Sequence, residues 1–402
     1  MSKVVVIGAG QAAASTVARL RSKGFDGDIT LFGDEPQPPY QRPPLSKAYL
    51  LGDMALERLF LRPETFYGEN SIDLRTGVRV EAVDPAAKTI TAAGENHSYD
   101  HLIFCTGSEP RRLPAAIGGD LDGVFVVRTL ADVDDMAPHC KDGARVLIVG
   151  GGYIGLEAAA VASKLGLNVT LVEAADRILQ RVAAPETSDF FRDLHTSHGV
   201  DLREGCGLVK LTGDGAVSGA ELTDGTTLDV DFVIVGVGIT PGIGLAEAAG
   251  VAIDNGIKVN TYGQTSDPSI WAAGDCASYP GAGGQMRLES VGNAVDMGEL
   301  VADNIMDAGR EYVAKPWFWS DQYDVKLQIA GLNTGYDRVV VRDAGDGPRS
   351  HWYYAGDTLL AVDAMNDPRG YMVGKRLIEA GKSPAPDQIG DASSDLKALL
   401  KA

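Results

Sequence analysis

The chain begins with a glycine-rich stretch of the kind that binds the phosphates of a dinucleotide. The apolar run Lys3–Ile7 is typical of a buried parallel strand, and apolar residues recur at helical spacing after Gly8, Gly10 and Ala13. In such a stretch the first glycine permits a tight turn and the second lets the backbone approach a pyrophosphate. The small third residue allows close packing of the helix, whose N-terminus then faces the phosphates.

A second stretch of the same kind lies in the middle of the chain. The apolar run Arg145–Val149 precedes Gly150-Gly151-Gly152-Tyr153-Ile154-Gly155, and a helical pattern with Glu157 in its first turns follows. The pattern predicts a second strand, glycine turn and helix. We expect the phosphate-binding positions to be Gly150, Gly152, Tyr153, Ile154 and Gly155.

Acidic residues follow the second strand of each predicted unit. Asp34 or Glu35 ends the run Asp28–Phe32, and Glu173 ends the run Asn168–Val172. A carboxylate at this place accepts hydrogen bonds from ribose hydroxyls and repels a 2′-phosphate. The second unit is therefore expected to bind NADH rather than NADPH, although Arg177 nearby would soften the repulsion.

Two dinucleotide sites in one chain suggest two cofactors that meet, and the usual chemical reason is hydride transfer from a nicotinamide to a flavin. We therefore expect FAD and NADH as cofactors. Such a reaction depends on proximity and orientation, so it needs no pair of general acid and base.

Composition excludes several other classes of protein. The chain has 402 residues, enough for two or three domains, and a formal net charge of −19, which argues against nucleic acid and anionic membranes as partners. It shows no apolar run of membrane-spanning length and no leader before Lys3, so a cytoplasmic protein is expected. The tail Gly381–Ala402 is expected to be loosely packed.

Cysteine and histidine patterns do not indicate a redox disulfide or a metal site. The four cysteines are widely spaced, and none forms a C-x-x-C pair. His195 and His198 stand three residues apart, but no third ligand is near them in the sequence. We expect no metal, and a one-electron acceptor would then have to be another protein.

Several later strings resemble the glutathione-reductase-like two-dinucleotide flavoproteins. The strand-like run that ends in Thr106-Gly107, the stretch from Asp231 to Pro241 with Gly238, and Ala273-Gly274-Asp275 carry this resemblance. It implies an α/β fold with two Rossmann-like dinucleotide-binding domains, in which the NAD domain interrupts the FAD domain, and a C-terminal α+β domain. The expected boundaries are 1–110 and 239–316 for the FAD domain, 111–238 for the NAD domain and 317–402 for the last domain.

Within that superfamily, the string PPYQRPPLSK, from Pro38 to Lys47, is more discriminating. Disulfide reductases carry their redox cysteines in this neighbourhood, and this chain has none there. The string resembles the NADH-dependent ferredoxin reductases of bacterial oxygenase systems, the putidaredoxin-reductase type, as do Arg287–Val291 and Pro316–Tyr323. The resemblance implies electron transfer to a [2Fe–2S] ferredoxin that feeds a haem monooxygenase or an aromatic-ring dioxygenase.

The resemblance also implies roles for individual residues. Lys47, Glu157 and Trp319 would act at the reacting rings: Lys47 near the isoalloxazine, Glu157 toward the nicotinamide and Trp319 beside the flavin. Asp275 would hold the ribityl chain. The full set implied for FAD is Gly8, Gly10, Ala13, Asp34, Glu35, Arg42, Lys47, Val80, Thr106, Gly107, Arg128, Asp275 and Val291. For NAD it is Gly150, Gly152, Tyr153, Ile154, Gly155, Glu157, Glu173 and Gly238.

One segment departs from the family pattern. Gly292 and Gly298 stand in a helix that should begin near Val291, and each weakens a helix by roughly 1 kcal/mol relative to Ala. The ferredoxin would dock nearby, and Arg310 and Lys315 are candidates for a basic docking face. The alternative interpretation is that both are ordinary solvated surface charges. Two other functions stay open: an NADH oxidase or peroxidase, and an NADH-sensing flavoprotein of the apoptosis-inducing-factor type.

Overall fold

The computed structural model describes residues 2–281, 283–343, 345 and 347–401, and the chain divides into two compact units. Unit 1 comprises Met1–Arg42, Met54–Glu109 and Ile239–Ala314. Unit 2 comprises Pro43–Asp53, Pro110–Gly238 and Lys315–Ala402. The second glycine-rich stretch therefore shares a compact unit with the C-terminal segment, and the three-domain boundaries stay a prediction.

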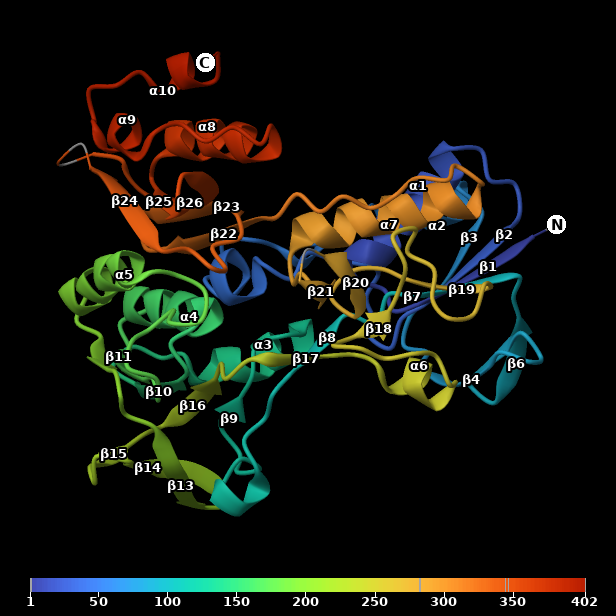
Figure 1. Cartoon of the computed structure of the whole chain (residues 1–402). Coiled ribbons are helices and arrows are strands. Elements are labelled where there is room, and N and C mark those ends of the chain that lie inside the picture. Colours follow the sequence, from blue (N-terminus) through green and yellow to red (C-terminus); the bar gives the residue numbers. More distant parts are fainter. Residues whose placement is uncertain (1, 282, 344, 346, 402) are drawn as a thin grey trace. The chain divides into compact units, whose positions relative to one another are not determined.

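The main sheet of unit 1 is parallel, with strand order β19-β7-β1-β2-β3. Its central strand is β1 (Lys3–Ile7), whose last four residues are buried, as the unbroken apolar run predicts. Helices α1 (Gln11–Ser22) and α7 (Val291–Ile305) lie side by side against it (Figure 1). The other strands are β2 (Asp28–Phe32), β3 (Ile72–Arg75), β7 (His101–Phe104) and β19 (Ile270–Ala272).

Shorter elements complete unit 1. An antiparallel sheet joins β4 (Val80–Asp84), β5 (Thr89–Ala92) and β6 (Glu95–Ser98). Another joins β18 (Ile257–Lys258), β20 (Ala277–Gly281) and β21 (Gly284–Met286), and β17 (Ile239–Pro241) pairs with β8 (Ser108–Pro110). The remaining helices are α2 (Glu64–Glu69), α6 (Gly244–Ala248) and the 3-10 turn Leu56–Arg58.

Unit 2 repeats the same parallel arrangement, with strand order β12-β11-β10-β16-β9. Lys3 of β1 pairs with Asp28 of β2 in unit 1, and Arg145 of β10 (Arg145–Val149) likewise pairs with Asn168 of β11 (Asn168–Val172). The duplicated glycine-rich openings thus begin two matching strand pairs. Further elements are β9 (Val124–Phe125), α3 (Leu130–Met136), α4 (Tyr153–Lys164), α5 (Pro185–Ser197), β12 (Asp201–Arg203), β16 (Phe232–Val235), and two 3-10 turns, Ala115–Ile117 and Ala137–His139. A small sheet joins β13 (Leu208–Asp214), β14 (Ala216–Leu222) and β15 (Thr227–Asp229).

The C-terminal part of unit 2 is an antiparallel sheet covered by helices, with strand order β22-β23-β26-β25-β24. Its elements are β22 (Trp317–Gln322), β23 (Val325–Gly331), β24 (Arg338–Asp343), β25 (Arg349–Ala355), β26 (Thr358–Met365), α8 (Pro368–Glu379), α9 (Pro386–Gly390) and α10 (Leu396–Leu399). The prediction that the tail Gly381–Ala402 is loosely packed is wrong at two positions, because Ile389 and Leu396 are buried in the same apolar cluster as Trp352.

The segment Pro43–Asp53 belongs to unit 2, although the residues on both sides of it belong to unit 1. It contains a π-helical turn, η1 (Leu45–Tyr49), whose backbone departs from helical geometry at Lys47, with φ −131° and ψ −110°. Tyr49 anchors its end with a 2.8 Å hydrogen bond to Asp134 of α3. This excursion carries Lys47 into unit 2.

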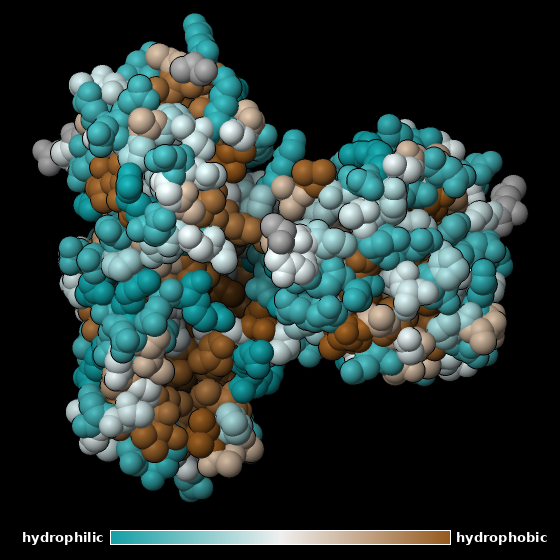
Figure 2. Space-filling view, in the orientation of Figure 1, coloured by the Kyte–Doolittle hydropathy of each residue, from teal (hydrophilic) through white to brown (hydrophobic). Residues whose placement is uncertain are grey.

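Surface and core follow the composition. Apolar residues of β10, α4 and α5 pack with Val325 and Leu327 of β23, so the parallel sheet and the C-terminal sheet of unit 2 share one apolar cluster. The face shown in Figure 2 is mainly hydrophilic, with apolar residues gathered over β9 and β16. Among the described residues, no helix has the length and apolar character needed to cross a membrane.

Candidate functional site

The second glycine turn, between β10 and α4, leaves room for a phosphate. A Cβ on Gly150 would lie 2.4 Å from the carbonyl oxygen of Gly236, and one on Gly155 only 2.0 Å from that of Gly150, so both positions require glycine. Gly152 is the N-cap of α4 and, within the described part of the chain, has neither a side-chain cap nor a neighbour that a Cβ would meet within 4 Å. The first N–H groups of α4 are thus available to an anion, which fits a dinucleotide pyrophosphate.

The first turn of α4 adds a polar atom without a partner. The hydroxyl of Tyr153 is buried and has no hydrogen-bond partner among the described residues, while its ring packs 4.8 Å from that of Phe318. Ile154 is 42 % exposed beside it. Gly238, with φ +104°, lies in the short link between β16 and β17. Its carbonyl accepts a 2.9 Å hydrogen bond from Arg111 N.

Glu173 follows β11 and closes over the glycine turn. Its Oε2 accepts a 2.7 Å hydrogen bond from the backbone N–H of Gly151, and its Oε1 accepts one of 2.8 Å from Ala175. These bonds fix the carboxylate at the end of the strand, where ribose recognition is expected. Arg177 instead donates to Ser188 Oγ at 2.5 Å, so a partner on α5 holds its guanidinium.

Lys47 and Glu157 form a shielded ion pair inside unit 2. Lys47 Nζ lies 2.9 Å from Glu157 Oε1, and the two side chains are 16 % and 8 % exposed. Ser320 Oγ donates to the same carboxylate at 2.8 Å, and Ser46 Oγ lies 3.5 Å from it. Burial raises the pKa of Glu157, while Lys47 and the Ser320 hydroxyl lower it.

Trp319 lies on β22, one residue before Ser320. Its ring stacks against that of Trp317 with centroids 5.5 Å apart and planes 20° apart, and both side chains are half-buried. Because successive strand residues face opposite sides, Trp319 and Ser320 belong to different faces of the sheet. Arg128, also predicted at the site, precedes α3, and its backbone N–H donates to Asp132 at 3.1 Å.

The first glycine turn, in unit 1, has the same features as the second. Gly8 has φ +100°, and a Cβ there would lie 2.3 Å from the carbonyl oxygen of Cys105. Gly10 is the N-cap of α1, and in the described residues no side chain caps it and a Cβ would meet nothing within 4 Å. Ala13 is fully buried, in keeping with close helix packing. These residues fit a second dinucleotide.

The acidic residues after β2 differ in their surroundings. Asp34 is exposed, whereas Glu35 forms a 2.6 Å ion pair with Arg42 and accepts a hydrogen bond from Tyr40. The Arg42 guanidinium also lies 5.1 Å from the centre of the Tyr40 ring. Arg42 is thereby held near the end of β2, close in sequence to both predicted ribose contacts.

The remaining predicted FAD residues lie in four places of unit 1. Asp275 follows β19 and accepts a 3.1 Å hydrogen bond from Ser108. Its neighbour Gly274 brings the chain close to the first glycine helix, because a Cβ on Gly274 would lie 3.0 Å from that of Ala12. Val80 is buried at the start of β4, Val291 is the first residue of α7, and Thr106 and Gly107 follow β7, where Thr106 Oγ1 donates to Gly242 at 2.5 Å.

The two glycines of α7 do not interrupt that helix, which runs from Val291 to Ile305. A Cβ on Gly298 would lie 2.5 Å from the carbonyl oxygen of Ala12, and Thr16 Oγ1 donates to the Gly298 carbonyl at 3.1 Å. Gly298 is therefore the point of close approach between α1 and α7. Gly292 is buried in the first turn.

Ser320, Gln322 and His195 extend the Glu157 site and were not predicted from the sequence. Gln322 Nε2 donates to Ser320 Oγ at 3.1 Å, and His195 Nε2 lies 2.8 Å from Gln322 Oε1. The available signal was that Ser320 and Gln322 stand two residues apart in a predicted strand, which places two polar side chains on one face. His195, weighed only as a metal ligand, carries no sequence mark of this role.

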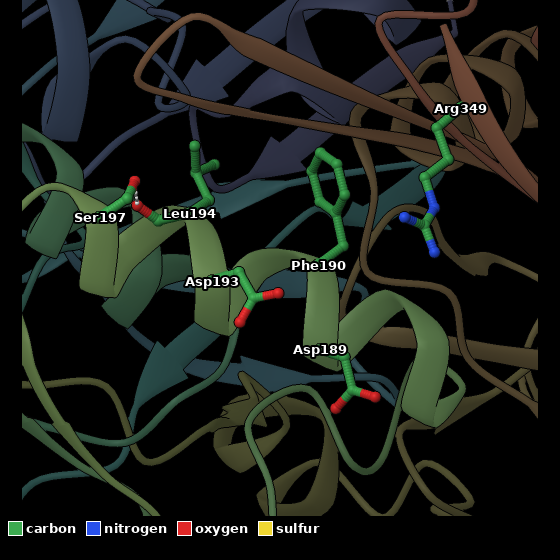
Figure 3. Close-up of a pocket in the computed structure, with 6 residues that line it drawn as sticks. All are labelled: Asp189, Phe190, Asp193, Leu194, Ser197 and Arg349. Atoms are coloured by element: carbon green, nitrogen blue, oxygen red, sulfur yellow. Dashed lines mark hydrogen bonds between the residues drawn. The ribbon is translucent and has the colours of Figure 1, made fainter. Parts of the chain in front are cut away.

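An open hollow of about 340 Å³ lies elsewhere in unit 2 (Figure 3). Figure 3 shows its lining on α5 and the neighbouring strand: Asp189, Phe190, Asp193, Leu194, Ser197 and Arg349. None of the predicted site residues lines it. In the described parts of the chain no group of three His, Cys, Asp or Glu side chains gathers to hold a metal ion, and the four cysteines are free.

Family models match almost the whole chain. The model described as pyridine nucleotide-disulphide oxidoreductase matches residues 2–298, and the one described as reductase C-terminal matches residues 317–400. The division between the two matches falls next to Trp317, where the expected C-terminal domain begins.

Curated proteins of similar length also match. The chain is 43% identical to the ferredoxin reductase subunit of 5,5′-dehydrodivanillate O-demethylase from Sphingobium, over 99% of this chain and 98% of that protein. It is 42% identical to rhodocoxin reductase of Rhodococcus erythropolis, over 99% and 94% of the two chains. It is 40% identical to putidaredoxin reductase of Pseudomonas putida, over 99% and 97%.

Solved structures agree with this match. The fold superposes on putidaredoxin reductase from its covalent complex with putidaredoxin with a TM-score of 0.96 at 38% identity, over 100% and 98% of the chains. For a ferredoxin reductase from Rhodopseudomonas palustris the TM-score is 0.95 at 38% identity, with complete coverage of both chains. An NAD-dependent persulfide reductase from A. fulgidus, at 23% identity and a TM-score of 0.89, shares the fold.

Proposed function

Because the chain belongs to the pyridine nucleotide-disulphide oxidoreductase family, we propose that it is a ferredoxin reductase of a bacterial oxygenase system. It takes electrons from NADH and delivers them, through FAD, to a [2Fe–2S] ferredoxin. The ferredoxin in turn feeds a haem monooxygenase or an aromatic-ring dioxygenase. The similarity over whole chains to reductases of such systems supports this proposal.

Unit 2 supplies the residues for NADH. Gly150, Gly152 and Gly155 allow the pyrophosphate to approach the N-terminus of α4, where Tyr153 is the first residue. Glu173 receives the ribose hydroxyls and discriminates against a 2′-phosphate. Ile154 and Gly238 border this site, and Arg128 contributes to the flavin side.

Unit 1 supplies the residues for FAD. Gly8, Gly10 and Ala13 serve the pyrophosphate at the N-terminus of α1. Arg42 lies along the pyrophosphate, and Asp275 holds the ribityl chain. The other residues proposed to bind FAD are Asp34 or Glu35 at the ribose, Val80 at the adenine, Thr106 and Gly107 after β7, and Val291 at the pyrimidine end of the flavin.

The Lys47–Glu157 pair is the observation that carries the proposal. FAD, when bound, would supply a ring able to take up a hydride from NADH and to pass electrons on one at a time. Lys47 provides a positive charge that stabilises negative charge on the reduced ring, and Glu157 holds the lysine ammonium in place at 2.9 Å. Lys47 stands in the part of the sequence where related disulfide reductases carry redox cysteines. Trp319 packs beside the flavin.

The acceptor docks through charge and over the flavin edge near Trp319. Arg310, one basic candidate, is paired with the buried Asp303, which also holds Arg19 at 2.7 Å. Lys315, the other candidate, is exposed and has no ion pair among the residues that the structure describes. Lys315 is thus the better placed of the two to meet an acidic ferredoxin.

We place the protein in the cytoplasm.

NADH-driven reduction of cytochrome c, with and without added [2Fe–2S] ferredoxins, tests the function. We expect reduction to depend on a ferredoxin and to fall as salt rises. Reduction that does not need a ferredoxin would contradict the proposal. Rapid oxygen uptake with NADH alone would instead indicate an oxidase, and NADH-dependent dimerisation without turnover would indicate a sensing flavoprotein.

A further inference from the structure

A chain of buried hydrogen bonds leads from the Glu157 carboxylate to His195. Ser320 Oγ lies 2.8 Å from Glu157 Oε1, Gln322 Nε2 lies 3.1 Å from Ser320 Oγ, and His195 Nε2 lies 2.8 Å from Gln322 Oε1. The side chains of Ser320, Gln322 and His195 are fully buried. Water therefore does not compete for these bonds, and each bond polarises the next.

The secondary structure explains how the chain forms. Ser320 and Gln322 are two residues apart on β22, so they share one face of the strand. His195 lies on the buried face of α5, whereas Asp189 and Asp193 of the same helix are exposed at the hollow drawn in Figure 3. The buried face of α5 thus carries the imidazole of the hydrogen-bond chain, and the exposed face carries the two aspartates.

The Glu157 carboxylate sets the direction of every bond. An ionised carboxylate only accepts, so Ser320 must donate to it and must itself accept from the amide nitrogen of Gln322. The amide oxygen of Gln322 then faces His195, whose Nε2 must carry the proton. All donors in the chain point toward Glu157.

Tyr323 closes the far end of the chain. With Nε2 protonated, neutral His195 presents Nδ1 as an acceptor, and the Tyr323 hydroxyl lies 3.2 Å from it. Tyr323 stands in the two-residue turn after β22 with φ 54°, and its ring stacks on His198 with centroids 3.7 Å apart. Burial raises the pKa of Tyr323 to about 12, so this hydroxyl stays a donor.

We propose that His195 is a positioning residue that keeps the Glu157 carboxylate ionised and oriented. It acts through Gln322 and Ser320, whose hydrogen bonds it aligns. Protonation at Oε1 would require the serine hydroxyl, the amide and the imidazole tautomer to reverse together, and protonation at Oε2 would weaken Oε1 as the acceptor of the Ser320 hydroxyl, so the chain opposes both. The consequence for turnover rests on the role proposed above for the Lys47–Glu157 pair.

The charged and titratable groups around the chain fit this role. Lys47 faces Glu157 from η1 and favours its ionised form, while Asp321 on β22 opposes it. His195 faces Gln322 and Tyr323, with His198 as the titratable neighbour on its own side. Burial lowers the pKa of His195 to about 4, which keeps the imidazole neutral at neutral pH.

Carboxyl-carbon NMR of the FAD-loaded protein, labelled at the side-chain carboxyl of glutamate, tests the proposal. The Glu157 resonance is assigned from its loss in Glu157→Gln. In His195→Leu we expect the pKa of Glu157 to rise by about one unit, a tenfold gain in proton affinity. In His195→Gln, whose amide retains a donor, the gain should stay below about threefold.

Asp193→Asn provides the matched control, because it changes a charge on the exposed face of α5 and should leave the Glu157 titration unchanged. The pH profile of FAD reduction by NADH should move with the NMR pKa in each variant. Because the titration uses neither NADH nor a ferredoxin, its result is independent of the assay that tests the proposed function.

Two outcomes overturn the proposal. One is an unchanged pKa of Glu157 in His195→Leu. The other is an equal rise in His195→Leu and His195→Gln, since this would reflect packing rather than the donor. If His195→Leu yields no folded protein, Gln322→Met breaks the chain at similar volume, and an unchanged Glu157 titration there also overturns it.

Discussion

Lys47 and Glu157 are joined by a 2.9 Å ion pair that is largely shielded from solvent, so each charge is compensated mainly by the other. Removing one partner of a buried pair leaves an uncompensated charge and costs about 3 kcal/mol of stability. We expect Lys47→Met and Glu157→Gln each to lower the unfolding free energy by that order, and the double variant to lose much less than their sum. Urea unfolding of the three variants measures this, and additive losses would contradict the pairing.

The same two single variants should slow the reduction of bound FAD by NADH by about tenfold, equivalent to roughly 1.4 kcal/mol in the barrier. Stopped-flow absorbance of the flavin measures the rate. Lys326→Met, which removes an exposed lysine on β23, is the matched control. A reduction rate equal to that of the unmodified protein in both site variants would show that the pair serves stability alone.

Glu173 predicts the choice of nicotinamide cofactor. Its carboxylate is held by backbone N–H groups of Gly151 and Ala175 at the end of β11. We expect Glu173→Gln to raise the KM for NADH about tenfold and to increase the relative use of NADPH, because a negative charge no longer repels the 2′-phosphate. Steady-state kinetics with both cofactors measure the ratio. Arg177 donates its guanidinium hydrogen bond to Ser188, so Arg177→Gln should leave the preference for NADH in place.

Gly152 and Gly155 should separate cofactor binding from folding. A Cβ on Gly152 meets no atom of the described residues within 4 Å, so Gly152→Val should fold normally yet obstruct the phosphate and raise the KM for NADH more than tenfold. Gly155→Ala places a Cβ 2.0 Å from the Gly150 carbonyl and should destabilise the protein by about 2 kcal/mol. Thermal unfolding and NADH kinetics on both variants distinguish the two effects. Equal melting temperatures for the two variants would contradict the prediction that only Gly155→Ala destabilises the protein.

Gly298 should resist a change that helix propensity favours. Replacement by Ala normally stabilises a helix by about 1 kcal/mol, as expected for Gly68 in α2, where a Cβ meets nothing within 4 Å in the described chain. Gly298→Ala should instead destabilise by about 2 kcal/mol, because its Cβ would lie 2.5 Å from the Ala12 carbonyl of α1. Unfolding free energies of opposite sign for the two variants are the expected result.

His195 should make the protein sensitive to acid. Its pKa falls from 6.5 to about 4 on folding, so the unfolded chain binds more protons and stability declines as pH drops through that interval, by up to about 3 kcal/mol. Asp363, whose burial raises its pKa to about 6, acts in the opposite direction over part of the range. The unfolding free energy of His195→Gln should therefore depend less on pH between 6.5 and 4 than that of the unmodified protein. Parallel slopes would contradict this.

Sequence reasoning predicted what local chemistry determines. The strands Lys3–Ile7, Asp28–Phe32, Arg145–Val149 and Asn168–Val172 match their predicted bounds, because unbroken apolar runs and glycine turns mark the edges of buried parallel strands. The family and its cofactors were also predicted, since the glycine turns and the strings after them are specific.

Other features depend on contacts between distant parts of the chain. His195 lies far in sequence from Gln322, and no periodicity links an α5 residue to a β22 residue. Gly298 was interpreted as a weak point of its helix, but its reason is the helix it touches. Ile389 and Leu396 look like scattered apolar residues in a polar tail and become buried only through the C-terminal sheet.

The excursion Pro43–Asp53 has a consequence for exchanging parts between relatives. Unit 2 is not one continuous stretch of chain, so its three segments, Pro43–Asp53, Pro110–Gly238 and Lys315–Ala402, must be transplanted as a set. A chimaera that takes the two long segments and leaves the short one behind would contain Glu157 without Lys47, its ion-pair partner. Although the chain folds into two compact units, the three segments of unit 2 can be exchanged only together.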